Sequence, residues 1–132
     1  MRLTLNKDQR LKRRKQIGKV FSDGKPVQSF PLRAVVLFHE EDGPLLQAGF
    51  SVSTRNFKKA VDRNRIKRLM KEVYRHLRPS LEEVLQASGR KLSVFWIFTG
   101  KELPELQLLK DKMNLLVNRL TDQINGYHQK NS

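Results

Sequence analysis

The pattern of apolar and polar positions predicts two long amphipathic helices. Between Lys58 and Arg78, apolar residues recur three and four positions apart, which is the spacing of a helix with one buried face. A second series with the same spacing follows Pro104 and predicts a helix that continues to about Asn125. Pro79 is expected to end the first helix, because the residue before a proline disfavours helical geometry.

Short apolar segments between the helices predict β-strands. Leu32–His39 and Lys91–Thr99 are rich in β-branched and aromatic residues, and Leu46–Ser53 alternates between larger and small or polar side chains. Val27–Phe30, between two prolines, is a candidate edge strand. The acidic turn at residues 40–44 separates two of the strands and predicts a hairpin between them.

Two shorter helices complete the order of elements. Arg13–Asp23 has helical spacing and is followed by Gly24 as a C-cap, and Ser80–Ser88 starts with a capping-box pattern. The order helix, two or three strands, helix, strand, helix predicts an α/β (α+β) two-layer sandwich with the helices on one sheet face. The unit spanning residues 46–99 would be expected to cross over right-handed, as parallel strand–helix–strand units generally do.

Length and composition are those of one folded domain. We interpret residues 13–125 as a single domain, flanked by a basic N-terminal arm at 1–12 and a polar tail at 126–132. The 132 residues include no cysteine, which excludes disulfides and thiolate metal sites and fits a reducing compartment. No apolar span is long enough to cross a membrane and the first residues do not resemble a signal peptide, so we expect a cytoplasmic protein.

The charge points to an anionic partner. Lysine and arginine number 27 against 13 acidic residues, for a formal charge of +14. Such a charge on a small folded domain favours nucleic acid first and an anionic membrane surface second. Membrane binding would need a free apolar face, and the apolar stripe of the central helix is expected to be used by the core.

Cations on the central helix lie on one arc of roughly 140°, beside its apolar stripe. Like charges four residues apart repel, so their clustering is explained if a polyanion lies along this face. Two alternatives to a nucleic acid on this arc are an acidic protein partner and a solvated cationic face without a partner. The side chains that we assign to RNA binding, called here the basic face, are Arg63, Asn64, Arg65, Lys67, Arg68, Lys71 and Arg75, and Arg78 continues the same arc.

No catalytic cluster is visible in the sequence. His39, His76 and His128 are far apart and lack metal-ligand spacing. The acidic clusters at residues 40–42 and 82–83 fit a solvated loop and a solvated helix turn. No glycine-rich phosphate loop and no paired acids of a metal-dependent nuclease are present. The sequence therefore predicts a protein without its own bond-breaking chemistry or metal site.

Two motifs carry a resemblance to a known family. The segments Gly49–Ser53 (GFSVS) and Ala60–Glu72 (AVDRNRIKRLMKE) closely resemble the signature of the bacterial ribonuclease P protein component. Arg13-Arg14, Val20-Phe21 and Gly24 are similar to the first helix of that family, and the resemblance covers roughly residues 10–120. It implies the order α-β-β-β-α-β-α, similar to domain 2 of ribosomal protein S5, with a left-handed β-α-β crossover.

The resemblance also implies a function and its partners. The protein would be a monomeric, non-catalytic subunit of the ribonuclease P ribonucleoprotein, an endoribonuclease whose RNA removes the 5′ leader of precursor tRNA. Mg²⁺ would act through the RNA and not at a protein-only site. One alternative is a structural RNA-binding protein of the ribosomal type, which would co-purify with ribosomal RNA. The other is a self-sufficient ribonuclease, which would cleave precursor tRNA without added RNA.

The resemblance places two RNA-binding surfaces on this chain. The Arg-Asn-Arg region of the basic face would contact the catalytic RNA, and a cleft between the first helix and the sheet would hold the single-stranded leader. Ile17 and Thr54 depart from the aromatic and the lysine common in the family, which puts the strength of leader binding in question. The expected leader-binding residues are Arg13, Phe21, Ser51, Ser53 and Arg55, although Phe21 could instead be a core aromatic.

Overall fold

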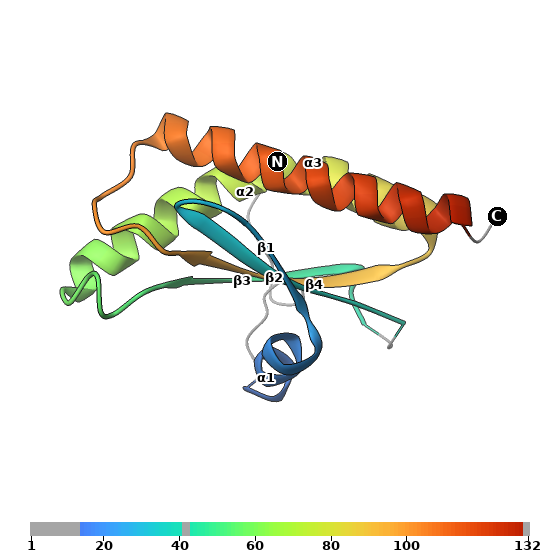
Figure 1. Ribbon diagram of the computed structural model, residues 1–132, viewed down its shortest axis with the longest axis horizontal. Helices are drawn as coiled ribbons and strands as arrows, with labels where there is room; N and C mark the ends of the chain where they lie inside the picture. The colour runs from blue at the N-terminus through green and yellow to red at the C-terminus, as the bar shows by residue number, and fades with distance from the viewer. Residues whose placement is uncertain (1–13, 41–42, 131–132) are drawn as a thin grey trace.

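The computed structural model describes residues 14–40 and 43–130, which form three helices and one four-stranded sheet (Figure 1). The N-terminal arm predicted at residues 1–12 lies outside the described residues. The predicted α+β class and element order are confirmed. The elements are α1 (Arg14–Asp23), β1 (Lys25–Ser29), β2 (Leu32–His39), β3 (Leu46–Val52), α2 (Ala60–Ser88), β4 (Lys91–Phe98) and α3 (Leu106–Lys130).

The strands lie in the order β1-β2-β4-β3. β2 pairs antiparallel with both β1 and β4, whereas β3 pairs parallel with β4. The predicted hairpin between β2 and β3 is therefore wrong, because β4 lies between them. β4 is apolar on both faces, with Trp96 buried on one and Phe95 partly buried on the other, and such a strand is best covered in the middle of a sheet.

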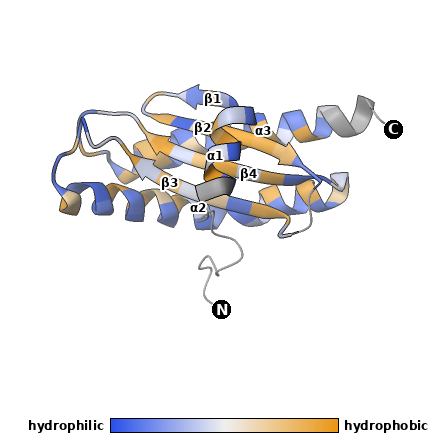
Figure 2. Cartoon of the chain, turned by 90° about the horizontal axis from the view of Figure 1, so that it is seen from below, coloured by the Kyte–Doolittle hydropathy of each residue, from blue (hydrophilic) through white to orange (hydrophobic). Residues whose placement is uncertain are grey.

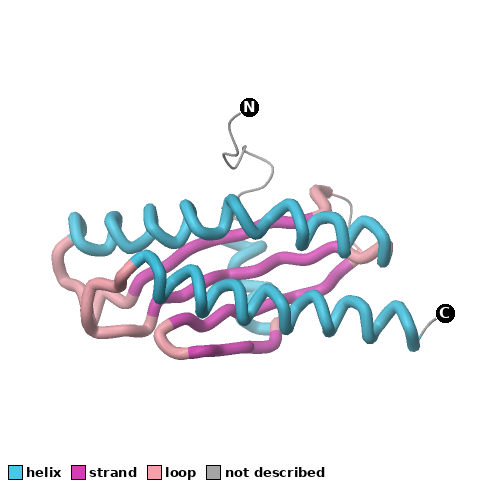
Figure 3. The backbone as a smooth tube through the Cα atoms, turned by 90° about the horizontal axis from the view of Figure 1, so that it is seen from above, coloured by secondary structure: helices cyan, strands magenta, loops and turns pink. Residues whose placement is uncertain are grey.

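The segment from β3 through α2 to β4 joins two neighbouring parallel strands. Figure 3 shows the sheet with α2 and α3 in front of it. If the picture is turned so that β3 and β4 both point upward, β4 lies to the left of β3, and α2 crosses in front of the sheet between them. The crossover is left-handed, as the family resemblance implied and against the general right-handed rule.

The two sheet faces are covered unequally. α2 and α3 pack side by side on one face and enclose the main core, in which Tyr74, Trp96 and Phe98 are almost fully buried (Figures 1 and 3). α1 lies on the opposite face, where Val20 packs against Val35 in a smaller apolar cluster. The expectation that all helices share one face is wrong for α1, whose short apolar stripe covers only part of the sheet.

Helix α2 does not end at Pro79 but continues to Ser88, so the separate helix predicted from Ser80 is part of it. A proline inside a helix costs about 3 kcal/mol. Leu81 and Leu85, beyond the proline, are completely buried, and each contributes about 1.5–3 kcal/mol. Their burial therefore offsets the cost. The Ser80 hydroxyl donates a hydrogen bond to the Leu77 carbonyl (2.9 Å) and makes no cap.

The ends of the long helices also differ from the prediction. α2 begins at Ala60 without a side-chain cap, two residues after the expected Lys58. It ends at Ser88, and the C-cap residue Gly89 has a φ of 74°, in the left-handed region that favours glycine. α3 continues to Lys130, beyond the expected end near Asn125. Both helices thus extend along the length of the sheet (Figure 3).

Candidate RNA interface

The first half of α2 separates its side chains as the sequence predicted. Ile66, Met70 and Val73 are buried against the sheet and α3. Asn64, Arg65 and Arg68 are exposed, and Lys67 is partly buried at the border. Lys71 is exposed with its Nζ 6.0 Å from the centre of the Phe50 ring, close enough for a cation–π contact.

Arg63 has a role within the protein. Its Nη1 donates hydrogen bonds to the carbonyl oxygens of Phe57 and Lys58, both at 2.8 Å. These contacts fasten the loop before α2 to the first turn of the helix, which has no side-chain cap of its own. Part of this guanidinium is therefore used to hold the helix start in place.

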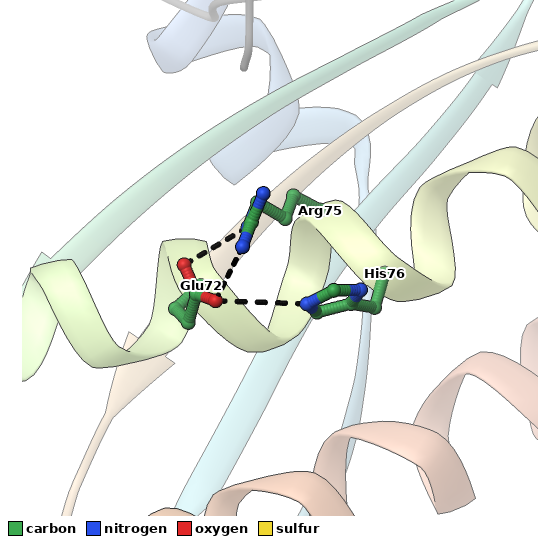
Figure 4. A network of polar contacts seen from close by, with 3 residues as sticks. All are labelled: Glu72, Arg75 and His76. Carbon is green, nitrogen blue, oxygen red and sulfur yellow. Dashed lines mark hydrogen bonds and ion pairs between the residues drawn. The ribbon is translucent and has the colours of Figure 1, made fainter. Parts of the chain in front are cut away.

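Arg75 forms an ion pair within α2 (Figure 4). Its Nε and Nη2 donate to the two oxygens of Glu72 at 2.9 and 2.7 Å, and Nε2 of His76 lies 3.5 Å from the same carboxylate. The Arg75 hydrogen bonds lower the pKa of Glu72, and the same contacts raise the pKa of Arg75. Glu72 thus offsets one of the positive charges of the basic face.

Arg78 is not part of the exposed arc, which corrects the sequence analysis. Only 8% of the residue is exposed, and its Nε lies 3.2 Å from an oxygen of Glu82. Tyr74 and Leu81, four residues before and three after it, are fully buried, so Arg78 shares their side of the helix.

The opposite side of the sheet presents a different chemistry. Phe21 of α1 is 48% exposed, and its ring packs edge-on against Phe95 of β4 with centroids 5.1 Å apart. Ile17, one turn earlier, is partly buried in the apolar cluster beneath α1. Phe21 is therefore neither a fully buried core residue nor a free one. One side of its ring packs on the sheet and the rest is open to solvent.

The polar residues expected in the leader cleft fall on the same side or at its end. Ser51 is opposite Ile97 of β4 in the sheet register, and Ile97 shares its face with Phe95, since side chains alternate along a strand. Ser53 follows β3 and is partly buried, and Arg55 is exposed in the next loop. Figure 2 views this α1 side of the sheet. Arg13 lies outside the described residues.

Phe95 contacts the candidate leader-binding residue Phe21, and the sequence analysis did not single it out. It was assigned only to a buried strand, yet it supports the exposed ring of Phe21. Strand alternation puts Phe95 on the opposite face from Val94 and Trp96, but β4 is apolar on both faces, so the sequence did not show which of these residues face the main core.

Within 14–40 and 43–130, no three histidine, cysteine, aspartate or glutamate side chains are grouped so that they could hold a metal ion. In the same part of the chain, no helix has the length and hydropathy needed to span a membrane.

The family model for ribonuclease P matches residues 5–120. The chain belongs to the ribonuclease P protein family. The ribonuclease P protein component of Porphyromonas gingivalis is 31% identical over 128 residues, which are 96% of this chain and 93% of the relative. That of Chlorobium phaeobacteroides is 30% identical over 131 residues, covering 89% and 88%.

Solved structures of ribonuclease P proteins share the fold. The Staphylococcus aureus RNase P protein superimposes with a TM-score of 0.66 at 17% identity, over 86% of this chain and 96% of the other. A second structure of the Staphylococcus aureus protein gives a TM-score of 0.59. The resemblance read from the sequence is thus confirmed at the level of family and fold.

Proposed function

We propose that this chain is the protein subunit of ribonuclease P and that it binds both the catalytic RNA and the 5′ leader of precursor tRNA. Membership of the family carries the assignment to ribonuclease P. The observation that supports RNA binding is the concentration of exposed cations on the first half of α2. In residues 63–75, the only acidic side chain is Glu72.

The catalytic RNA would lie along the basic face. Arg65, Arg68 and Lys71 are exposed, and guanidinium groups suit phosphate because they can donate two parallel hydrogen bonds. Asn64, exposed among them, can reach a base edge or a sugar hydroxyl. Arg63 would act mainly by positioning this part of the helix, since its Nη1 is bonded to the backbone.

The leader would lie on the α1 side of the sheet. Single strands are bound by basic surfaces with aromatic rings on which bases stack, and Phe21 offers such a ring. Ser51 and Ser53 can donate hydrogen bonds to the backbone of the strand, and Arg55 can contact a phosphate at the end of the sheet. The leader and the catalytic RNA would then contact opposite sides of the protein.

The bond cleavage would belong to the RNA. The role of Mg²⁺ in this proposal follows from the family resemblance, with the ion bound by RNA and water oxygens. The protein would contribute positive charge, which lowers the concentration of Mg²⁺ that the RNA needs to hold its phosphates close together.

Reconstitution tests the proposed function. The purified protein, freed of RNA, is added to a bacterial ribonuclease P RNA and precursor tRNA at a Mg²⁺ concentration at which the RNA alone is inactive. We expect cleavage at the mature 5′ end only when both protein and RNA are present. Absence of rescue at every protein concentration contradicts the proposal, and cleavage by protein alone supports a self-sufficient ribonuclease instead.

A further inference from the structure

Among the residues whose exposure the structure describes, Phe30 has the most exposed large apolar side chain. It is 71% exposed, in the turn between β1 and β2. The turn is held in place, because the carbonyl of Pro31 accepts hydrogen bonds from the backbone nitrogen (2.8 Å) and the hydroxyl (3.1 Å) of Thr99. An aromatic ring is thus displayed to solvent on a fixed turn, where it contributes little to folding.

The turn lies at the end of the sheet where Thr99 follows β4, because Thr99 is bonded to Pro31 of the turn. Arg33 of β2 is opposite Ile97, and Ile97 is opposite Ser51, so these three residues form one row across the α1 side. The ring of Phe95, which supports Phe21, is two residues before this row, and Thr99 is two residues after it. At about 3.3 Å per residue, Thr99, which is bonded to Pro31 of the turn, lies roughly 13 Å along the chain from Phe95, which contacts Phe21.

Cations gather around this end of the sheet from three connected segments. Gly100 packs against Pro31, since a methyl group on it would lie 3.1 Å from the proline Cβ. Asn56 Nδ2 donates to the carbonyl of Gly100 at 3.2 Å and so ties in the loop before α2. The exposed charged residues of segments 29–33, 53–59 and 99–102 are Arg33, Arg55, Lys58, Lys59 and Lys101, against Glu102 alone.

We propose that Phe30 is a second stacking platform for single-stranded RNA, which extends the leader-binding surface beyond Phe21. A nucleobase would stack on the exposed ring, while Arg33, Arg55 and Lys101 contact the flanking phosphates. The inference rests on the proposed function and adds to it the path and length of the bound leader. An exposed aromatic ring at an end of the sheet that is rich in cations fits a nucleic acid strand better than an apolar partner, which would leave those charges unpaired.

The first test replaces Phe30 with alanine and measures binding of the ribonuclease P holoenzyme to precursor tRNAs with progressively shorter leaders. Removing one stacked base should weaken binding of the long-leader substrate by about 5- to 150-fold. Binding of leaderless mature tRNA should not change. In Phe30→Ala, the gain in affinity with leader length should therefore end at a shorter leader than in the wild type. Phe30→Tyr, which keeps the ring, should behave as wild type.

The second test uses fluorescence. Trp96 is the only tryptophan of the chain and is completely buried, so a tryptophan introduced at position 30 supplies the exposed signal. Phe30→Trp should be quenched by long-leader precursor tRNA and not by mature tRNA, because a stacked base quenches the indole. Leu115→Trp, on the outer face of α3 and 40% exposed in the native protein, is the matched control and should not respond to the leader.

The outcomes separate this inference from the function on which it rests. If Phe21→Ala weakens long-leader binding but Phe30→Ala does not, and the tryptophan at position 30 is not quenched, the leader path stops at Phe21 and the inference is wrong. The proposed function then stands. If the wild type neither rescues cleavage nor prefers long leaders, both are wrong.

Discussion

At the scale of the residue, the side chains of the basic face differ in role, because some contact the protein itself and others are exposed. Arg63 and Arg68 belong to the same motif, but Arg63 donates to two backbone carbonyls whereas Arg68 is exposed. A hydrogen bond from a charged donor contributes about 1.5–3 kcal/mol, less where water competes. Arg63 should therefore contribute to the stability of the protein, and Arg68 chiefly to its binding of RNA.

Replacing each arginine with alanine tests this difference. Arg68→Ala should leave the thermal midpoint unchanged and reduce the salt dependence of RNA binding by roughly one unit of slope. Arg63→Ala should lower the free energy of unfolding by about 1–2 kcal/mol, because the carbonyls of Phe57 and Lys58 lose a donor. The measurements are thermal unfolding of the free protein and titration of ribonuclease P RNA at several salt concentrations.

Lys110→Ala supplies the control, since Lys110 is an exposed cation on α3, outside the basic face. It should change neither quantity by as much as the two arginine variants. Equal stability losses in Arg63→Ala and Arg68→Ala would show that the backbone contacts of Arg63 have no energetic weight. An unchanged salt slope in Arg68→Ala would remove that residue from the interface.

For single residues, the sequence predicts which face of a helix is buried or exposed, but not which groups a side chain contacts. Helical spacing separated the buried Ile66 from the exposed Arg65 correctly. It could not foresee that Arg63 reaches the carbonyl of Phe57, since that depends on the path of an irregular loop. The burial of Arg78 did have a signal. Glu82 follows it by four residues, and such a pair can accompany the arginine into a partly buried position.

At the scale of the element, strands were easier to locate than to pair. The β-branched run Leu32–His39 gave the bounds of β2 correctly, because such residues favour extended backbone. The place of β4 in the middle of the sheet depends on contacts distant in sequence. The sequence did indicate this central position, because Lys91–Phe98 carries apolar residues on both faces of the strand.

The length of α2 shows the same limit for helices. Local chemistry at Pro79 favours a stop, but the burial of Leu81 and Leu85 is a tertiary effect that a local rule does not weigh. The result is one continuous helix in which the exposed cations of the first half are fixed relative to a core-packed second half. A rigid support of this kind keeps the basic face in one geometry before RNA arrives.

Glu72 limits the charge that this helix presents, and Glu72→Gln tests its effect. The substitution keeps the shape and helix propensity but removes the negative charge beside Arg75. RNA binding should become tighter, with a salt dependence steeper by up to about one unit of slope, as Arg75 gains a phosphate contact. The measurement is titration of ribonuclease P RNA over a range of salt concentrations.

The pH dependence provides the control for this variant. The pKa of Glu72 is lowered by Arg75, so the ion pair is intact at neutral pH and is lost only as the pH falls through that depressed value. Acidification should therefore release Arg75 in the wild type. The affinities of the wild type and of Glu72→Gln for ribonuclease P RNA should then become more similar. A difference that stays constant into the acidic range would mean that Glu72 does not restrain Arg75.

At the scale of the whole molecule, the sheet separates two surfaces. α2 with its exposed cations lies on one side, and α1 with Phe21 lies on the other (Figure 1). The sequence contained the residues of both surfaces, but their separation depends on the position of α1, which was predicted on the wrong face. A protein with a net charge of +14 can thus contact two RNA segments without forcing their phosphates together.

This separation predicts that the two surfaces act independently. Phe21→Ala should weaken binding of long-leader precursor tRNA but not of ribonuclease P RNA, whereas Arg68→Ala should weaken binding of ribonuclease P RNA. In the double variant, the losses in free energy for assembling protein, RNA and long-leader substrate should add within about 0.5 kcal/mol, as they do for distant sites without shared partners.

A double-mutant cycle on the reconstituted holoenzyme measures this additivity, and thermal unfolding confirms that Phe21→Ala is folded. A coupling energy well above that limit would mean that α1 and α2 influence each other through the sheet, since the ring of Phe21 rests on β4 and α2 packs on its other face.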